Sequence, residues 1–168
     1  IGITGTNGKT TTTTLVGKIF SAKFPDTKIV GNIGYPALEE SVKADDNTFL
    51  ITELSSYQLE SINGFKPKIS AILNITEDHL IRHKTMKAYS NAKFRIFENQ
   101  EARDYLVLNY DDSMLRLNQE DVKPKIVYFS RKQILNEGVF VENEHIVACF
   151  NGEKEYIMNV DEISLLGS

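Results

Sequence analysis

IGITGTNGKTTTTTLVGKIF, residues 1–20, decides the fold of this chain. It opens with a short β-type run, Ile1–Thr4, that stops at Gly5, and Gly8-Lys9-Thr10 then begins a helix. The apolar residues of that helix lie on one face: Leu15, Val16, Ile19 and Phe20. The first amide groups of a helix have no partner within it and point at an anion. The order of strand, glycine turn and helix therefore predicts a phosphate-binding loop.

The loop is a short form of the glycine-rich phosphate loop. The general pattern has a further glycine five residues before Gly8, where this chain has Ile3. Lys9 adds a mobile positive charge, and the Thr10 hydroxyl can bind a phosphate-bound Mg²⁺. The alternative interpretation is a glycine turn before an ordinary amphipathic helix. We predict that phosphates contact these loop residues: Gly5, Thr6, Asn7, Gly8, Lys9, Thr10 and Thr11.

The composition suits one soluble globular domain, since 41% of the 168 residues are hydrophobic and 25% are charged. A formal net charge of −4 argues against broad binding to nucleic acid or to anionic membranes. The single cysteine, Cys149, excludes an internal disulfide and fits a reducing, cytoplasmic compartment. It lies in the apolar run 146–150, which predicts a buried, inert thiol.

The ends of the chain point to a longer protein. The sequence starts at Ile1 rather than at Met, directly on the strand before the phosphate loop, and it stops at Ser168 with no closing helix. We interpret residues 1–168 as one domain cut from a larger chain.

Strand-like runs alternate with helical patterns along most of the sequence. Strands are expected at 28–30, 49–54, 69–75, 105–109 and 125–130, and helices at 84–99 and 111–118. This alternation predicts an α/β fold, a mainly parallel P-loop or Rossmann-like sheet with helices on both faces. Ligands of such sheets bind at the carboxyl ends of the strands, so the glycine loop, Glu53 and residues 76–79 are expected in one cleft.

The last part of the chain has another character. Short strands are expected at 138–142, 146–150 and 155–160, and Asn151-Gly152 is a strong hairpin turn. We predict a small antiparallel sheet near the carboxyl terminus, appended to the main one.

Several charged residues have two interpretations. Glu53, at the end of an apolar strand, either caps a local network or holds a metal, and the nearby Lys-Thr loop favours Mg²⁺. His79 follows two acidic residues after a buried strand, whereas His83 is expected to face solvent and His145 to lie in a surface turn.

The spacing of Lys93 predicts that it is part of a salt-bridged helix face with Arg95 and Glu98. Asn32 fits a turn position as well as a site.

Five motifs in order resemble the central domain of the Mur ligase family: GTNGKT (5–10), GNIG (31–34), ELSSYQLE (53–60), NITEDHL (74–80) and NAKFRIFEN (91–99). The third and fourth are similar to those of members that add D-glutamate. Folylpolyglutamate synthases share the phosphate loop but do not resemble the chain at 53–60. The resemblance covers nearly all of residues 1–109 and more loosely the rest.

The resemblance implies an ATP-dependent ligase of peptidoglycan precursor synthesis. ATP phosphorylates the carboxylate of UDP-N-acetylmuramoyl-L-alanine, and the amine of D-glutamate attacks the acyl phosphate. Both partners are small molecules, so we expect no nucleic acid or membrane partner, and a monomer. An amino-terminal domain for the uridine nucleotide and a carboxyl-terminal domain for adenine and the amino acid are implied to lie outside this chain. We therefore expect the chain alone not to ligate.

The resemblance also implies roles for single residues. Thr10 and Glu53 hold Mg²⁺ between the ATP phosphates, and His79 helps hold a second Mg²⁺ near the acceptor carboxylate. Lys93 matches a carbamylated lysine, in which a carboxylate-like group replaces the cation and can bind the metal. Lys9, His79 and Lys93 are thus the expected catalytic residues.

By the same resemblance, Asn32, Ser55 and Ser56 lie near the acceptor substrate. One position departs from the family: Ile81 stands where an acid is usual, and an isoleucine cannot orient a ligand or accept a hydrogen bond. Another Mur ligase, a folylpolyglutamate synthase and a nucleotide-binding module without chemistry are the alternatives.

Overall fold

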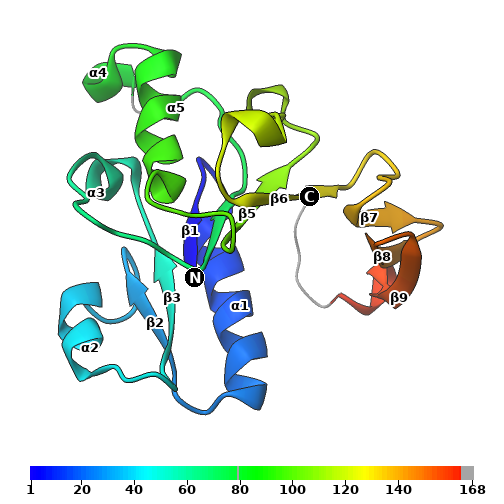
Figure 1. The fold of residues 1–168 in the computed structure, drawn as a ribbon, viewed down its shortest axis with the longest axis horizontal. Coiled ribbons are helices and arrows are strands. Elements are labelled where there is room, and N and C mark those ends of the chain that lie inside the picture. Colours follow the sequence, from blue (N-terminus) through cyan, green and yellow to red (C-terminus); the bar gives the residue numbers. More distant parts are fainter. Residues whose placement is uncertain (79, 164–168) are drawn as a thin grey trace.

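The computed structural model describes residues 1–78 and 80–163. Within them a nine-stranded sheet runs in the order β2-β3-β1-β4-β5-β6-β7-β8-β9 (Figure 1). Its strands are β1 (Gly2–Thr4), β2 (Thr27–Gly31), β3 (Phe49–Glu53), β4 (Ile69–Ile72), β5 (Tyr105–Asn109), β6 (Lys125–Ser130), β7 (Gly138–Glu142), β8 (His145–Phe150) and β9 (Glu153–Asn159). The central strand β1 therefore lies between β3 and β4, and its phosphate loop opens between the loops that follow those two strands.

The helices of the described residues occupy the connections between the parallel strands. They are α1 (Lys9–Lys23), α2 (Ala37–Lys43), α3 (Ser56–Glu60), α4 (Leu80–His83) and α5 (Met86–Phe94), with 3-10 turns η1 (Arg95–Phe97), η2 (Ser113–Leu115), η3 (Gln119–Asp121) and η4 (Val160–Glu162). In the part of the chain that the structure describes, none of these helices is long and apolar enough to cross a bilayer.

All pairings from β2 through β7 are parallel, and β7-β8-β9 are antiparallel. The predicted antiparallel strands exist, but they extend the main sheet through the parallel β6–β7 pair instead of forming a separate sheet. The predicted hairpin turn is confirmed, with Asn151 at φ 54° and Gly152 at φ 78°. Two positive φ angles in a two-residue turn match the right-handed twist of the strands that it joins.

Helices cover both faces of the parallel sheet. Ile29 and Ile51 are register partners and point to one face, where a Cβ atom on Gly17 of α1 would lie 2.6 Å from the Ile29 side chain. Gly2 points to the other face, where a Cβ atom would lie 3.3 Å from Ile96 of η1. The main core lies on this second face, below α3 and α5: Leu54, Leu59, Ile72, Ile75, Tyr89, Ile96, Leu106, Leu108 and Leu115.

Helix α1 packs with a different face from the predicted one. Thr13 and Gly17 are its buried residues, because small side chains at this spacing let the helix approach the sheet. Leu15 and Ile19, expected on the apolar face, are 40% and 60% exposed. Phe20 contributes to the contact by packing on Phe49 of β3, with 5.5 Å between the ring centroids.

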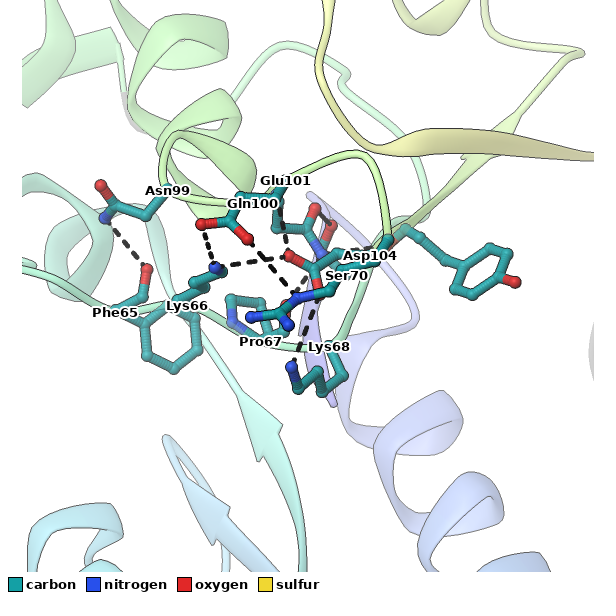
Figure 2. A network of polar contacts seen from close by, with 11 residues as sticks. Phe65, Lys66, Pro67, Lys68, Ser70, Asn99, Gln100, Glu101 and Asp104 are labelled. Atoms are coloured by element: carbon teal, nitrogen blue, oxygen red, sulfur yellow. Dashed lines mark hydrogen bonds and ion pairs between the residues drawn. The ribbon is translucent and has the colours of Figure 1, made fainter.

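A polar network fixes the amino-terminal edge of the sheet, opposite the phosphate loop (Figure 2). Gln100 is 1% exposed, and its Oε1 atom accepts a hydrogen bond from Ser70 Oγ at 2.7 Å. Its Nε2 atom donates to the carbonyl oxygens of Pro67 and Tyr105 at 2.9 and 3.0 Å. Because every polar group of the amide is paired, this buried side chain ties the start of β5 to the segment before β4.

One predicted helix is wrong. Residues 111–118 contain only the short turn η2, because two aspartates bind backbone groups outside the helical pattern. Asp111 accepts hydrogen bonds from Ser130 Oγ at 2.6 Å and Arg131 N at 2.8 Å. Asp112 accepts from Ile75 N at 2.7 Å and Met114 N at 3.0 Å. These side chains join the loop after β5 to its neighbours on both sides.

Candidate active site

Three loops meet at the carboxyl ends of β3, β1 and β4. In the register of the sheet, Ile3 pairs with Glu53 and Thr4 pairs with Ile72. The Thr4 hydroxyl also donates to the Leu54 carbonyl at 2.7 Å, and Leu54 N donates to the Ile3 carbonyl at 2.9 Å. The glycine loop, Glu53 and the segment after β4 thus lie side by side, as the parallel topology requires.

The glycine loop has the geometry of an anion site. Gly8 is the N-cap of α1 at φ 79°, a left-handed conformation that favours glycine. The first hydrogen bond of the helix runs from Thr12 N to the Gly8 carbonyl at 2.9 Å. The preceding amides, those of Lys9, Thr10 and Thr11, have no carbonyl partner within the helix and are oriented for an anion.

Asn74, in the loop after β4, shapes the glycine loop. Its Oδ1 atom accepts from Asn7 N at 2.8 Å and Thr6 N at 3.1 Å, and its Nδ2 atom donates to the Asn7 carbonyl at 3.0 Å. Thr6 Oγ1 also lies 3.2 Å from the Tyr89 hydroxyl and accepts from Thr76 N at 3.0 Å. The loop is therefore held by residues of the loop after β4 and of α5 as well as by its own glycines.

Lys9 lies along the loop. Its Nζ atom donates to the carbonyl oxygens of Gly5 and Thr6 at 3.0 and 2.8 Å. These bonds hold the cation beside the first turn of α1 and its unpaired amides. An ammonium group in this position adds positive charge where a phosphate would bind.

Lys93 is buried and turned into the same loop. It is 1% exposed, and its Nζ atom donates to the Gly5 carbonyl at 2.8 Å and lies 4.7 Å from the centre of the Tyr89 ring. The pKa of Lys93 is lowered to about 7, first by burial and then by the positive charge of Lys9, while Asp78 opposes the shift. The salt-bridged helix face predicted from spacing is wrong for Lys93, because only Arg95 and Glu98 pair there, at 2.9 Å.

Glu53 fits a cation ligand. The residue is 1% exposed, and its Oε1 atom accepts a hydrogen bond from Asn32 Nδ2 at 2.8 Å. Its Oε2 atom is buried and receives no hydrogen bond from the residues that the structure describes. A buried carboxylate oxygen left unpaired is costly, so this oxygen is suited to a metal ion.

The other predicted metal ligands are less fully defined. Thr10 lies on the exposed first turn of α1, and His79 lies outside the described residues. Over residues 1–78 and 80–163, no three His, Cys, Asp or Glu side chains gather as a metal site. A metal at Glu53 would thus depend on oxygen atoms from hydroxyl groups, phosphates, water or a modified Lys93.

Asn32 and the two serines, predicted to lie near a substrate, lie close to Glu53 in the structure. Gly31, at φ 103°, has no room for a Cβ atom, which would lie 2.3 Å from the Glu53 carbonyl oxygen. Asn32 N donates to that same oxygen at 2.9 Å. Ser55 caps α3 by a reciprocal pair of bonds with Gln58, whereas Ser56 is 2% exposed and points inward.

The prediction that His83 faces solvent is wrong. The residue is 6% exposed, and its Nε2 atom lies 3.0 Å from Ser56 Oγ. Its Nδ1 atom lies 3.1 Å from Glu60 Oε1, so the ring bridges two positions of α3.

His145 lies at the β7–β8 turn as predicted, with Nδ1 2.8 Å from the Asn143 carbonyl. Cys149 is buried, also as predicted, and its thiol donates to the Asn136 carbonyl at 3.2 Å.

Sequence reasoning missed the side chains that hold the loop, above all Asn74 and Tyr89. Asn74 lies in a quoted motif and Tyr89 on the predicted helix, but their spacing gives no sign of a bond to Thr6 or Asn7.

A cavity of about 620 Å³ also opens next to the loop, at the ends of β4, β5 and β6. Its lining includes Asn74, Thr76, Asn109, Asp112, Arg131 and Lys132.

Comparison with protein families gives one match, to the model described as "Mur ligase middle domain", over residues 3–167. The chain is 52% identical over 167 residues to UDP-N-acetylmuramoylalanine–D-glutamate ligase of Clostridioides difficile (strain 630), covering 99% of the chain and 37% of that protein. It is 50% identical to the enzyme of the same name from Alkaliphilus oremlandii (strain OhILAs), covering 100% of the chain and 37% of that protein. The chain thus spans well under half the length of these curated relatives.

Two solved structures share the fold. A crystal structure of MurF from Acinetobacter baumannii has a TM-score of 0.67 at 19% identity, covering 93% of this chain and 36% of that one. MurF ligase from Thermotoga maritima in complex with ADP has a TM-score of 0.61 at 18% identity, covering 94% and 40%. At this identity the two structures establish the fold alone, an α/β sheet of the kind predicted from the sequence.

Proposed function

Because the chain belongs to the Mur ligase family, we propose that it is the phosphate-binding and metal-binding part of a ligase that joins D-glutamate to UDP-N-acetylmuramoyl-L-alanine. The names of the most similar relatives support the choice of amino acid, and the ADP complex of the Thermotoga structure supports an adenine nucleotide. The product is a peptidoglycan precursor, and we propose a cytoplasmic enzyme. The observation that carries the proposal is the arrangement of two lysines and one buried, half-paired carboxylate around a single glycine loop.

The chemical problem is to bring two anions together, the γ-phosphate of ATP and the acceptor carboxylate. The amides of the first turn of α1 and the Lys9 ammonium group would bind the phosphates and offset their charge. The cavity at the ends of β4 to β6 leaves room beside the loop for the rest of a nucleotide. On the other side of the loop, Asn32, Ser55 and Ser56 would border the acceptor carboxylate. Positioning by these groups supplies much of the rate enhancement, as in other phosphoryl transfers.

The bond changes follow from the substrates. A carboxylate oxygen bonds to the γ-phosphorus while the bond from that phosphorus to the bridging oxygen breaks, so ADP leaves and an acyl phosphate remains. The D-glutamate nitrogen then bonds to the acyl carbon and loses a proton, and the carbon–oxygen bond to phosphate breaks. The second step needs the site to hold the phosphate oxygens as charge returns to them, a task for Lys9 and the loop amides.

Mg²⁺ fits the residues present, since Glu53 Oε2 is buried without a donor from the described residues. The Thr10 hydroxyl and the Glu53 carboxylate would hold one ion, His79 would help to hold a second, and a carbamylated Lys93 would add a metal-binding group. Bound Mg²⁺ would supply positive charge that offsets the repulsion between the phosphates and the acceptor carboxylate. A carbamate forms when a neutral amine attacks CO₂ and releases a proton. Burial favours the neutral amine of Lys93, whose pKa is lowered to about 7. Lys93 therefore suits this modification better than any lysine on an exposed helix face.

The test uses the complete parent chain. Phosphate release from ATP is measured with Mg²⁺ and UDP-N-acetylmuramoyl-L-alanine, adding D-glutamate, L-lysine, L-alanine or no amino acid. We expect release that depends on D-glutamate. Phosphate release that depends on another amino acid would indicate a different member of the Mur ligase family. ATP binding without any phosphate release would favour a nucleotide-binding module. D-glutamate incorporation by the 168-residue chain alone would contradict the proposal that it cannot ligate by itself.

A further inference from the structure

A buried chain of polar contacts joins the loops after β3 and β4 behind the candidate site. His83 ends α4, which belongs to the β4 side, and it contacts two residues of α3, which belongs to the β3 side. Its Nε2 atom lies 3.0 Å from Ser56 Oγ and its Nδ1 atom lies 3.1 Å from Glu60 Oε1. No motif of the sequence and no part of the proposed mechanism uses this histidine.

The chemistry of Glu60 fixes the direction of one of the two bonds. Glu60 can only accept when ionised, so the Nδ1–H group of His83 donates to it. Arg82 donates to Glu60 Oε2 at 2.7 Å, and this guanidinium holds the pKa of the Glu60 carboxyl below its usual range. The Nε2 atom and the Ser56 hydroxyl lie at hydrogen-bond distance, and a hydroxyl can donate to a ring nitrogen or accept from it. The ring thus has both nitrogens used and one orientation.

Aromatic packing holds the ring in that orientation. Tyr57 stacks on His83 with 5.7 Å between ring centres and 6° between the planes, and Tyr89 lies at 5.1 Å on a tilted plane. Arg82 covers the outer face of Tyr57, with 4.7 Å from its guanidinium carbon to the ring centre. The packed His83 ring therefore fixes the position of α3 relative to α4.

The contacts of His83 reach the segment that carries Glu53. That segment is tied to β1 at Leu54, through bonds to the Ile3 carbonyl and from the Thr4 hydroxyl. Two residues later Ser56 is tied to His83. The phosphate loop is bonded to Asn74, which His83 does not touch in the contacts given above, and to Tyr89, whose ring also packs against His83.

We propose that His83 is a positioning residue, which through Ser56 and Glu60 sets the acceptor side of the site, the segment from Glu53 to Ser56. The inference rests on the proposed function. It distinguishes two halves of the site, because the polar contacts of His83 go to α3 on the acceptor side, whereas the phosphate loop is bonded to Asn74. Loss of the imidazole would leave the buried Ser56 hydroxyl without this hydrogen-bond partner, and the segment would relax away from the geometry that receives the acceptor carboxylate.

The experiment uses the complete parent ligase with His83→Gln, and with Ser56→Ala, which removes the same bond while the histidine stays. The matched control is His145→Gln, the same change at the turn between β7 and β8. In His83→Gln we expect the KM for UDP-N-acetylmuramoyl-L-alanine to rise about tenfold, with the KM for ATP unchanged. Ser56→Ala should shift the same constant in the same direction, and His145→Gln should shift neither.

Hydrogen exchange provides a second readout that needs no turnover. We expect faster exchange in peptides covering 53–60 of His83→Gln and unchanged exchange in peptides covering 5–14. Equal changes in both KM values, or faster exchange throughout the core, would mean that His83 only stabilises the fold and would overturn the proposal. Unchanged acceptor KM and unchanged exchange would overturn it too. A wild-type chain without D-glutamate-dependent release would refute the proposed function instead, and the exchange of 53–60 would then decide the role of His83 by itself.

Discussion

The ammonium groups of Lys9 and Lys93 donate hydrogen bonds to the same oxygen, the carbonyl of Gly5, at 3.0 and 2.8 Å. Lys9 comes from the first turn of α1, and Lys93 comes from α5, 84 positions later in the sequence. Two like charges on one carbonyl repel each other, and the buried member of the pair loses its charge more easily. The carbonyl therefore joins a lysine suited to bind phosphate to a lysine suited to be neutral.

Lys93 should make the stability of the chain depend on pH. Its folded-state pKa is lowered from 10.5 to about 7, so between these values the unfolded chain binds the proton that the folded chain has lost. The free energy of unfolding should rise with pH in this window, by up to about 1.4 kcal/mol per pH unit from this group. Urea unfolding of the chain and of Lys93→Met at pH 7, 8 and 9, in CO₂-free buffer, measures the difference.

The variant should lack this contribution. The free energy of unfolding of the natural chain should therefore rise relative to that of Lys93→Met as the pH rises. Lys18→Met, an exposed position of α1, is the control and should leave the slope unchanged. Parallel pH dependences for the chain and for Lys93→Met would contradict the account of Lys93.

Lys9 should determine nucleotide affinity. Lys9→Ala removes the positive charge beside the loop amides, and we expect the Kd for ATP to rise about tenfold or more, since charge-assisted bonds to phosphate are strong. Titration calorimetry of the parent chain with ATP measures the effect. Lys18→Ala removes a charge from the exposed middle of the same helix, and an equal loss in both variants would show that only general charge matters.

Glu53 should set the requirement for Mg²⁺. In Glu53→Gln the amide keeps the size of the side chain but weakens metal binding, so the Mg²⁺ concentration for half-maximal phosphate release should rise about tenfold. The free energy of unfolding without metal should not fall, because the change removes a buried charge with an unpaired oxygen. Glu39→Gln, on exposed α2, is the control. A Glu53→Gln enzyme with an unchanged Mg²⁺ requirement would exclude Glu53 as a ligand.

Gln100 should matter for stability and not for the site. Gln100→Leu leaves the Ser70 hydroxyl and the carbonyls of Pro67 and Tyr105 without their partner (Figure 2), which should lower the free energy of unfolding by about 2 kcal/mol. The Kd for ATP should stay the same, because this network lies at the opposite edge of the sheet. Gln133→Leu, on an exposed loop, should leave both unchanged. A change in ATP affinity in Gln100→Leu would show that the two edges are coupled.

Local patterns predicted the mainly parallel sheet, because the alternation of strands and helices depends on nearby residues, and the parallel topology then predicted that the loops converge. The phosphate loop is an example, since Gly8 and Lys9 define it within one turn. The packing face of α1 could not be predicted in this way. Its choice of Thr13 and Gly17 over Leu15 and Ile19 depends on how closely Ile29 of β2 approaches.

The surroundings of several polar residues also depend on tertiary contacts that local sequence patterns do not show. Lys93 and His83 look like surface residues on their helices, and only the tertiary fold buries them against Gly5 and against Ser56. The helix expected at 111–118 is absent for a related reason, because Asp112 accepts a hydrogen bond from Ile75 N, 37 positions away in the sequence, which local spacing cannot reveal. Ile81, which departs from the family, is 93% exposed, so its side chain makes no demand on the core.

One measurement tests the central claim most directly, the transfer of a phosphoryl group to a carboxylate before D-glutamate is added. The parent chain is supplied with ATP, Mg²⁺, D-glutamate and UDP-N-acetylmuramoyl-L-alanine whose alanyl carboxylate carries ¹⁸O, and the mass of the released phosphate is determined. The account predicts phosphate that carries one ¹⁸O atom and that forms only when D-glutamate is present. Phosphate without the label would contradict it, because no bond between the carboxylate oxygen and the γ-phosphorus would have formed.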